Sequence, residues 1–298
     1  PAAASNAASS PAPDAAPAGA PHAASNAAPN AAPDGTRGAA ARASTRLLIA
    51  GVAVPGLILL ALLGFSTLRA SQISAPSSLA PLRITVTAHM WWWEARYYDA
   101  SSGREAVVAN ELHIPASVPV YLALTSADVI HTFWLPSLSG KVDMLPGRLH
   151  GLTLRADKTG TYRGQCAEFC GAQHANMALH LTVHPAPEFA DWFANQATPA
   201  AASRIDQGRQ AFVQARCVSC HAVRGLDEQP PPDAPKAPDL THVGSRTTIA
   251  AGALPMNRGT LAAWIADPQA IKPGARMPAA TVSAEQVEAI ADWLESLK

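Results

Sequence analysis

Two thiols, an imidazole and a thioether lie within twelve consecutive residues of this sequence. The run Cys166-Ala-Glu-Phe-Cys170-Gly-Ala-Gln-His174-Ala-Asn-Met177 places three residues between its cysteines. Thiolate and thioether sulfur are soft ligands that suit copper, and imidazole binds copper as well. The spacing lets both thiol sulfur atoms face one point from a tight loop. This stretch therefore predicts a soft-metal site.

The donor atoms predict two copper ions in that site. Two thiolates are enough to bridge a pair of copper ions, with one imidazole for each ion and the thioether as a weak extra ligand. A second imidazole comes from His131 in a neighbouring strand-like run, and a backbone carbonyl, most easily that of Glu168, completes the second ion. The predicted ligands are His131, Cys166, Glu168, Cys170, His174 and Met177.

Three other uses of these cysteines are weighed against dinuclear copper. A tetrahedral zinc site could use Cys166, Cys170, His174 and His131, but it would leave Met177 without a role. A mononuclear blue-copper site takes one cysteine with two histidines. A disulfide framework would allow three pairings of the four cysteines. Dinuclear copper is the alternative that uses every ligand in the stretch.

A second cysteine pair predicts a covalently bound haem. The run Cys217-Val-Ser-Cys220-His221 is a C-x-x-C-H motif, which attaches c-type haem through its cysteines and supplies His221 as an axial ligand. The other axial ligand should be a methionine well downstream, since methionine–histidine ligation raises the potential of the iron. Met277, before a proline in KPGARMP, is the better candidate, and Met256 is its rival.

The residues before Pro185 predict an all-β scaffold for the copper loop. Strand-like runs separated by short polar, Gly or Pro connections are typical of a sandwich or barrel. Met144 to Arg148 reads as a turn, and the copper loop lies between two strands. The predicted runs begin at Leu82 and continue at 106–108, 118–124, 129–135, 149–154 and 179–183.

Three consecutive tryptophans, Trp91, Trp92 and Trp93, follow the first strand-like run. Neighbouring residues in a strand point to opposite faces, so all three cannot lie in the core. At least one should lie near the surface, where an aromatic side chain can contact a partner or pass an electron.

The N-terminal part predicts a disordered segment followed by a membrane helix. Residues 1–45 are mostly Ala, Pro, Ser, Asn and Gly, a composition that cannot bury a core. Residues 47–68 carry no charge, and as a helix they would span about 33 Å, enough to cross a bilayer. Basic residues are more frequent before this helix than after it, which favours an exported C-terminal part. The predicted transmembrane segment is 46–69.

The C-terminal part predicts a small helical haem domain. Residues 186–204 begin with a short helix and continue as a linker by composition. Helices are then expected at 208–215, 260–266 and 284–297, with Ser283 as the N-cap of the last. The predicted fold is a multi-domain membrane protein: one transmembrane helix, an all-β sandwich or barrel over 80–185 and an all-α haem domain over 205–298.

At this point the sequence resembles subunit II of haem–copper cytochrome c oxidases, with a fused cytochrome c domain. The resemblance covers 47–185 and 205–298 and is carried by Trp91-Trp-Trp93-Glu94, His131-Thr-Phe-Trp134-Leu-Pro136, Lys141-Val-Asp143-Met-Leu-Pro146-Gly147-Arg148, the stretch Cys166 to Met177, and the haem motif. It implies an all-β cupredoxin-like barrel that holds the dinuclear copper centre CuA, and an all-α class I cytochrome c domain that holds haem c.

The resemblance also implies roles for further residues. Glu168 would bind copper through its carbonyl and, through its carboxylate, a Mg ion shared with subunit I. Trp91 would be the tryptophan through which electrons enter. Asp143 and Arg148 would lie at the contact with subunit I.

The sequence departs from the family pattern near the membrane. Subunit II usually has two membrane helices, and the single helix visible here resembles the second. The first would lie upstream of Pro1, or the Ala/Pro-rich segment would replace it. A Glu often found near the start of the second helix, at a proton path, is absent from Arg46 to Pro55.

The resemblance predicts an electron-transfer subunit of a respiratory terminal oxidase in a bacterial inner membrane. Cytochrome c or another periplasmic donor would be the electron source, and subunits I and III would be partners. Oxygen would be reduced in subunit I, with proton translocation. A formal net charge of zero argues against nucleic acid as a partner. The alternatives are a CuA-containing electron-input subunit of a nitric-oxide reductase and a copper-delivery or sensor module.

Overall fold

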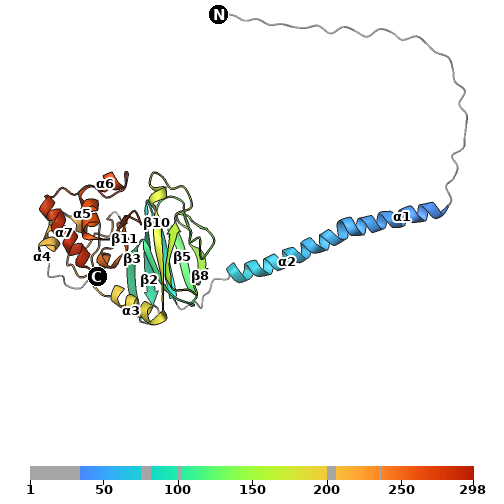
Figure 1. Ribbon diagram of the computed structural model, residues 1–298, viewed down its shortest axis with the longest axis horizontal. Helices are drawn as coiled ribbons and strands as arrows, with labels where there is room; N and C mark the ends of the chain where they lie inside the picture. Colours follow the sequence, from blue (N-terminus) through green and yellow to red (C-terminus); the bar gives the residue numbers. More distant parts are fainter. Residues whose placement is uncertain (1–33, 75–81, 100–101, 200–205, 235) are drawn as a thin grey trace, which may run out of the picture. The chain divides into compact units, whose positions relative to one another are not determined.

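The computed structural model describes residues 34–74, 82–99, 102–199, 206–234 and 236–298 (Figure 1). Residues 1–33 of the predicted disordered segment and residues 200–204 of the predicted linker lie outside this range. The chain divides into two units, Pro1–Thr67 and Leu68–Lys298, and each is taken by itself.

Helix continues through the predicted membrane segment and begins before it. Its parts are α1 (Asp34–Leu48), the π-helical turn η1 (Ile49–Ala53) and α2 (Val54–Ser74). The prediction of disorder was therefore wrong for residues 34–45, which are helical. No proline lies between Pro33 and Pro55, and several alanines, the best helix formers, lead directly into the apolar run.

The wide turn η1 lies immediately before Pro55. Proline has no N–H, and its ring would collide with the carbonyl four residues earlier in a regular α-helix. The N–H of Val54 instead reaches Ile49 O, five residues back, which opens the helix at this point. Among the described residues one helix, Arg42–Ser71, is long and apolar enough to span a membrane, with a mean hydropathy of 2.6. It contains the whole predicted segment 46–69.

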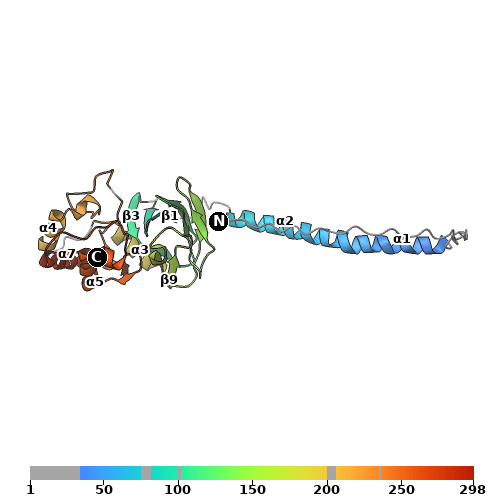
Figure 2. The same cartoon turned by 90° about the horizontal axis from the view of Figure 1, so that it is seen from above.

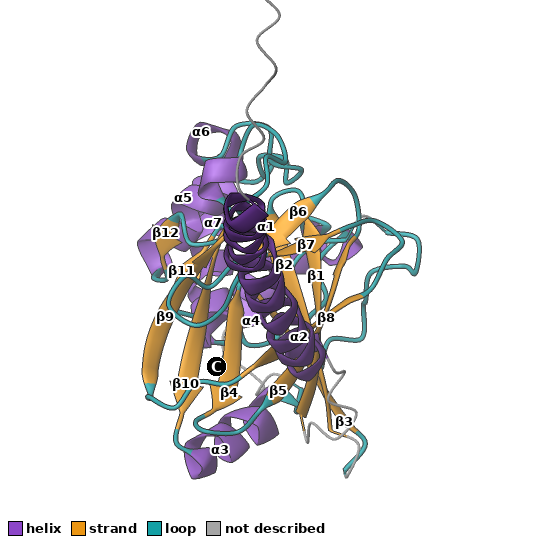
Figure 3. Ribbon diagram, turned by 90° about the vertical axis from the view of Figure 1, so that its right-hand side faces the viewer, coloured by secondary structure: helices purple, strands orange, loops and turns teal. Residues whose placement is uncertain are grey.

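Strands dominate the next part of the chain and form two main sheets (Figure 3). The first sheet has the order β3-β2-β1-β5-β8, with β1 and β5 parallel. The second has the order β4-β10-β9, with β4 and β10 parallel, and β6 pairs with β7. The strands are β1 (Leu82–His89), β2 (Trp92–Asp99), β3 (Arg104–Ala109), β4 (Glu111–Pro115), β5 (Val120–Ser126), β6 (His131–Phe133), β7 (Val142–Met144), β8 (His150–Leu154), β9 (Gly160–Gln165) and β10 (Ala178–His184).

Alternating apolar side chains from both sheets build one core. In β5 the side chains alternate between buried and half-buried along the strand, as expected for a sheet with one face on the core. Ile84, Leu122 and Leu124 from the first sheet meet Leu112 and Leu181 from the second. This barrel-like core is the scaffold that holds the copper loop.

Several predicted strands needed correction. Residues 129–135 were expected to be extended, but strand is confined to His131–Phe133. The run from Leu82 is interrupted at 90–91, where a turn reverses the chain so that β2 pairs antiparallel with β1. Strands β4, β7 and β9 were not predicted. β9 reads GTYRGQ, which lacks apolar alternation, and β7 has three residues, too few for a period to be visible.

The turn predicted after Met144 is present, and so is the helix after Pro185. Gly147 adopts a φ of +71°, and the Arg148 N–H donates to Leu145 O. Helix α3 (Ala186–Gln196) packs on the barrel through Phe193 and through Trp192, whose ring lies 5.2 Å from that of Tyr97. The first part of the predicted linker is therefore fixed on the copper domain.

The remaining helices gather around a second core (Figure 2). Helices α4 and α7 pack so closely that a Cβ on Gly208 would lie 2.1 Å from the carbonyl oxygen of Ala289. Trp293 lies between them, 5.0 Å from the Phe212 ring, and Ser283 caps α7 as predicted. The elements are α4 (Asp206–Gln214), η3 (Cys217–Ser219), η4 (Val243–Ser245), β11 (Thr248–Ile249), β12 (Leu254–Pro255), α5 (Arg258–Ala266), α6 (Pro268–Ile271) and α7 (Ala284–Ser296).

Candidate metal centre

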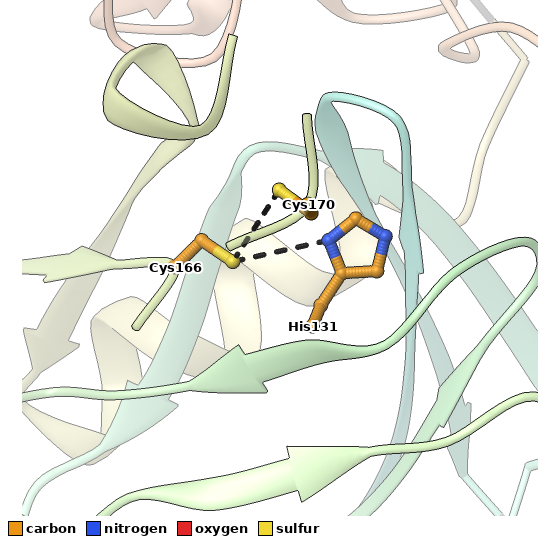
Figure 4. A group of neighbouring side chains, drawn as sticks. All are labelled: His131, Cys166 and Cys170. Atoms are coloured by element: carbon orange, nitrogen blue, oxygen red, sulfur yellow. Dashed lines mark hydrogen bonds between the residues drawn. The ribbon is translucent and has the colours of Figure 1, made fainter. Parts of the chain in front are cut away.

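The two cysteines of the copper loop and His131 converge in the barrel (Figure 4). Cys166 Sγ lies 3.8 Å from Cys170 Sγ and 3.8 Å from His131 Nδ1. All three side chains are buried. The loop leaves β9 and returns to β10, and the Cys166 N–H closes it by donating to Met177 O. The scaffold thus fixes both ends of the loop and, through β6, the histidine.

The other three predicted ligands lie around the same sulfur atoms. His174, in the short 3-10 helix η2 (His174–Asn176), places Nδ1 3.6 Å from Cys170 Sγ. Met177 Sδ lies 3.9 Å from Cys170 Sγ, and the Cys166 thiol lies 3.3 Å from Glu168 O. Two thiols, two imidazoles, a thioether and a carbonyl converge here. This donor set fits a pair of copper ions, whereas a tetrahedral zinc site would use four of the six groups.

Asp128 orients His131, although Asp128 was not among the predicted site residues. His131 Nε2 lies 2.8 Å from Asp128 Oδ1, so the imidazole donates its Nε2–H there and keeps Nδ1 available for a metal. Burial alone would raise the pKa of Asp128. Hydrogen bonds from His131 and from the Met90 and Val129 N–H groups lower it instead, to about 2. The spacing Asp128-Val-Ile-His131 is the one signal that could have indicated this pair.

Without metal, the two thiols have different pKa values. The Cys170 thiol beside Cys166 stabilises the Cys166 thiolate by hydrogen bonding, which lowers the pKa of Cys166. The same contact raises the pKa of Cys170, because a second negative charge beside the first is unfavourable. A bound metal ion requires thiolate ligands and displaces their protons. Metal binding to this pair should therefore release protons.

The tryptophans occupy three different environments. Trp91 lies in the turn after β1, and its Nε1–H donates to Cys170 O at 2.8 Å. Trp92 stacks on His89 with ring centroids 4.3 Å apart, and Trp93 is buried beside Phe133. Trp93 is buried and the other two are half-buried, so the prediction that all three cannot lie in the core is confirmed, and the turn at 90–91 separates Trp91 from β2. Trp91 touches the copper loop directly.

The resemblance places Asp143, Arg148 and Glu168 at the contact with subunit I, and all three lie near the surface. Asp143 Oδ1 accepts a hydrogen bond from Thr132 Oγ1 at 2.6 Å, next to His131. Arg148 and the Glu168 side chain are exposed. In the described part of the chain, close groups of three or more His, Cys, Asp or Glu side chains occur only at His131, Cys166 and Cys170. A magnesium site at Glu168 would therefore need ligands from outside these residues.

The predicted haem residues line one cavity of about 460 Å³. His221 Nδ1 lies 2.7 Å from Pro238 O, so it donates its proton there and presents Nε2 as the free ring nitrogen. Burial lowers the pKa of His221, which favours the neutral imidazole that a metal requires. Cys217, Cys220, His221 and Met277 line this cavity, together with apolar side chains that include Phe212, Leu261, Trp264, Ile290 and Leu294.

The cavity favours Met277 over Met256 as the second axial ligand. Met256 packs against the helical core and is not among the lining residues. The volume and the apolar walls fit a large planar cofactor. His242, which the sequence placed outside the ligand set, contacts Thr198 O through Nε2 and does not line the cavity.

The chain joins a β-scaffold that carries the sulfur loop to a helical domain that carries the C-x-x-C-H cavity. These two parts define a class of protein in which a cupredoxin-like domain is joined to a cytochrome c domain. Residues 90–183 match the family model for the periplasmic domain of cytochrome c oxidase subunit II, and residues 205–298 match the cytochrome c model. Together with the one candidate transmembrane helix, these matches confirm the predicted fold class.

Two relatives that align with most of this chain give the same assignment. Cytochrome c oxidase subunit 2 of Alkalihalophilus pseudofirmus is 34% identical over 265 residues, covering 86% of this chain and 74% of the relative. The Bacillus subtilis protein of that name is 33% identical over 228 residues, and the alignment spans 62% of its length. The crystal structure of the periplasmic domain of subunit II of cytochrome oxidase (CoxB) of Bradyrhizobium japonicum is 34% identical, covers 39% of this chain and 94% of its own, and has a TM-score of 0.37. The chain belongs to the cytochrome c oxidase subunit II family.

Proposed function

We propose that this chain is the electron-transfer subunit of a membrane-bound terminal oxidase. Electrons would pass from a donor such as cytochrome c, through haem c in the C-terminal domain, to a dinuclear CuA centre and on to haem in subunit I. Oxygen would be reduced to water there, with proton translocation. The domains would be 46–69, 80–185 and 205–298, with 186–204 between the last two.

One observation carries this proposal. The cavity lined by Cys217, Cys220, His221 and Met277 is also lined by Trp91. The Trp91 indole donates a hydrogen bond to Cys170 O in the copper loop. A single side chain therefore contacts the copper loop and borders the haem pocket, which provides a short covalent and hydrogen-bonded route between them.

The residues of the chain hold both centres in position. Haem c and dinuclear copper, when bound, each accept and release one electron. Cys217 and Cys220 would attach the haem, and His221 and Met277 would be its axial ligands. His131, Cys166, the Glu168 carbonyl, Cys170, His174 and Met177 would hold the copper ions. Burial of both cysteines and His131 limits access of water to that centre.

The remaining assignments concern partners and location. Exposed Asp143 and Arg148 would contact subunit I, and the Glu168 carboxylate would hold a Mg ion shared with that subunit. Subunit III would complete the complex. The helix within Arg42–Ser71 would anchor the chain in a bacterial inner membrane, with both metal domains on the periplasmic side.

Metal and haem analysis of the purified full-length protein tests the assignment. We expect two copper ions and one covalent haem per chain, with the copper pair sharing one unpaired electron in its paramagnetic resonance spectrum. One zinc ion without copper would contradict the copper assignment, and absence of covalent haem would contradict the other half.

The family match favours an oxidase over a nitric-oxide reductase subunit or a copper-delivery module. Turnover of the purified complex with oxygen, and not with nitric oxide, is the expected result. Slow or absent electron transfer from the haem to copper in the isolated chain would instead indicate delivery or sensing.

A further inference from the structure

A lysine from the haem domain is buried against the copper domain. Lys272 is 3% exposed, and within the described part of the chain its ammonium group contacts backbone carbonyls and no carboxylate. Nζ donates to Trp91 O at 2.8 Å, to Asn176 O at 2.7 Å and to Ala250 O at 3.0 Å. An ammonium group has three N–H donors. Each is used, and the acceptors come from three separate segments.

Two of these acceptors belong to the copper centre's surroundings. Trp91 contacts the copper loop, and Asn176 lies between the predicted ligands His174 and Met177. Lys272 itself precedes Met277 in the segment that borders the haem cavity. Beside it, Gln173 Nε2 donates to Pro273 O at 2.8 Å, and a Cβ on Gly274 would lie 3.6 Å from the Trp91 ring.

A second group of contacts joins the same domains further along the interface. Glu111 Oε1 accepts hydrogen bonds from the Thr247 N–H and hydroxyl, both at 2.7 Å. The Ala178 N–H of β10 donates to Ala251 O at 3.0 Å. The Ala178 contact directly follows Met177 at the end of the copper loop, whereas the Glu111 contacts lie on β4. Lys272 differs from both, because it donates from the Met277 segment to the backbone of Trp91.

We propose that Lys272 is a positioning residue that fixes the haem domain against the copper domain, holding the Met277 segment beside Trp91. The proposal rests on the proposed function, because this position matters only if electrons pass from haem to copper within the chain. A buried charge of this kind tolerates little movement, since displacement would leave the buried ammonium without hydrogen-bond partners. Its hydrogen bonds therefore select one relative position of the domains.

The test compares Lys272→Met with the wild-type full-length protein, both loaded with copper and haem. A photoexcited ruthenium complex reduces the haem rapidly, and absorbance follows electron transfer from haem to copper. We expect the intramolecular rate constant to fall about tenfold or more, the effect of losing hydrogen bonds to a charged group. The midpoint potential of the haem should be unchanged. Amide hydrogen exchange should increase at Thr247 and Thr248, whose N–H groups donate to Glu111.

Two further variants make the result decisive. Lys158→Met removes an exposed lysine of the copper domain and should match wild type in every measurement. Lys272→Gln retains two N–H donors without charge, so its electron-transfer rate constant should fall less than that of Lys272→Met. If Lys272→Met fails to bind haem, Lys272→Gln decides the test.

An unchanged rate and unchanged exchange in both Lys272 variants would overturn the proposal. A slower rate with a shifted haem potential would overturn it as well, because Lys272 would then act on the haem. If the wild-type protein itself transfers no electron from haem to copper, the proposed function fails, and that result is distinct from a wild-type rate in the variants.

Discussion

The copper loop and the haem pocket are built in different ways. Five of the six copper ligands come from one short loop, whose ends are fixed by β9 and β10, and their donor atoms lie 3.3–3.9 Å from the two sulfur atoms. The haem residues come from two distant segments and line a cavity of about 460 Å³ between helices. The barrel core consists of apolar side chains from two sheets, whereas the apolar walls of the haem cavity would be covered by a large cofactor. Metal loss and haem loss should therefore have different consequences for folding.

The largest expected effect comes from preventing haem attachment. Cys217→Ser combined with Cys220→Ser should abolish covalent haem and destabilise the helical domain, because its cavity walls would be exposed to water. The copper absorption spectrum should remain. Differential scanning calorimetry of the full-length protein measures both domains. If the helical domain without haem unfolds at the wild-type temperature, haem does not stabilise it, and the expected difference between the two regions is contradicted.

The next effect concerns Asp128, which supports one copper ligand. Asp128→Asn should weaken copper binding roughly 10–100-fold, the usual cost of losing the partner that orients a histidine ligand. Haem content should not change. Competition with a copper chelator measures the affinity. Asp157→Asn, at an exposed position, is the matched control, and an equal loss in both variants would argue against an orienting role for Asp128.

Trp91 links the two regions, and its replacement should have a smaller effect. Trp91→Phe retains an aromatic ring but loses the hydrogen bond to Cys170 O. We expect the rate from haem to copper to fall about fivefold, corresponding to one ordinary hydrogen bond. Trp92→Phe is the control, since Trp92 stacks on His89 away from the copper loop's backbone. Equal rates in the two variants would contradict a specific role for Trp91.

The smallest effect is acid sensitivity at the interface. Burial would raise the pKa of Glu111, but hydrogen bonds from His113 and Thr247 lower it overall. A carboxyl with a lowered pKa stabilises the fold above its unfolded pKa of about 4.3, and this stabilisation is lost as pH falls through the folded value. Nearby His113, His180 and Arg246 add positive charge that favours the carboxylate.

Glu111→Gln should therefore reduce the drop in thermal stability between pH 7 and about pH 3. Thermal unfolding at the two pH values measures this drop. Glu228→Gln, at an exposed position, should behave like wild type. A wild-type pH profile in Glu111→Gln would exclude this carboxylate as the source of acid sensitivity.

The sequence was informative where chemistry is local. The spacing of Cys166, Cys170, His174 and Met177 fits in one loop, and the structure places those donor atoms around the two sulfurs. The C-x-x-C-H motif likewise indicated its residues directly. In both cases residue type and short spacing determine what the side chains can reach.

The contacts between distant segments could not be predicted in this way. Lys272 is 181 residues from Trp91, and Thr247 is 136 residues from Glu111. Their pairing depends on how two folded domains meet, which leaves no periodic signal in the chain. The turn at 90–91 was missed because apolar residues continue through it, and the helical start at 34–45 because composition alone was used to predict disorder.

The central claim is that an electron placed on the haem passes to copper within the same chain. Rapid photoreduction of the haem in wild-type full-length protein, followed at separate haem and copper absorption bands, tests it directly. We predict that the haem is reoxidised as copper is reduced, with one rate constant that does not depend on protein concentration. A rate constant for copper reduction that rises in proportion to protein concentration would contradict the account. Copper reduction without matching oxidation of the haem would contradict it as well.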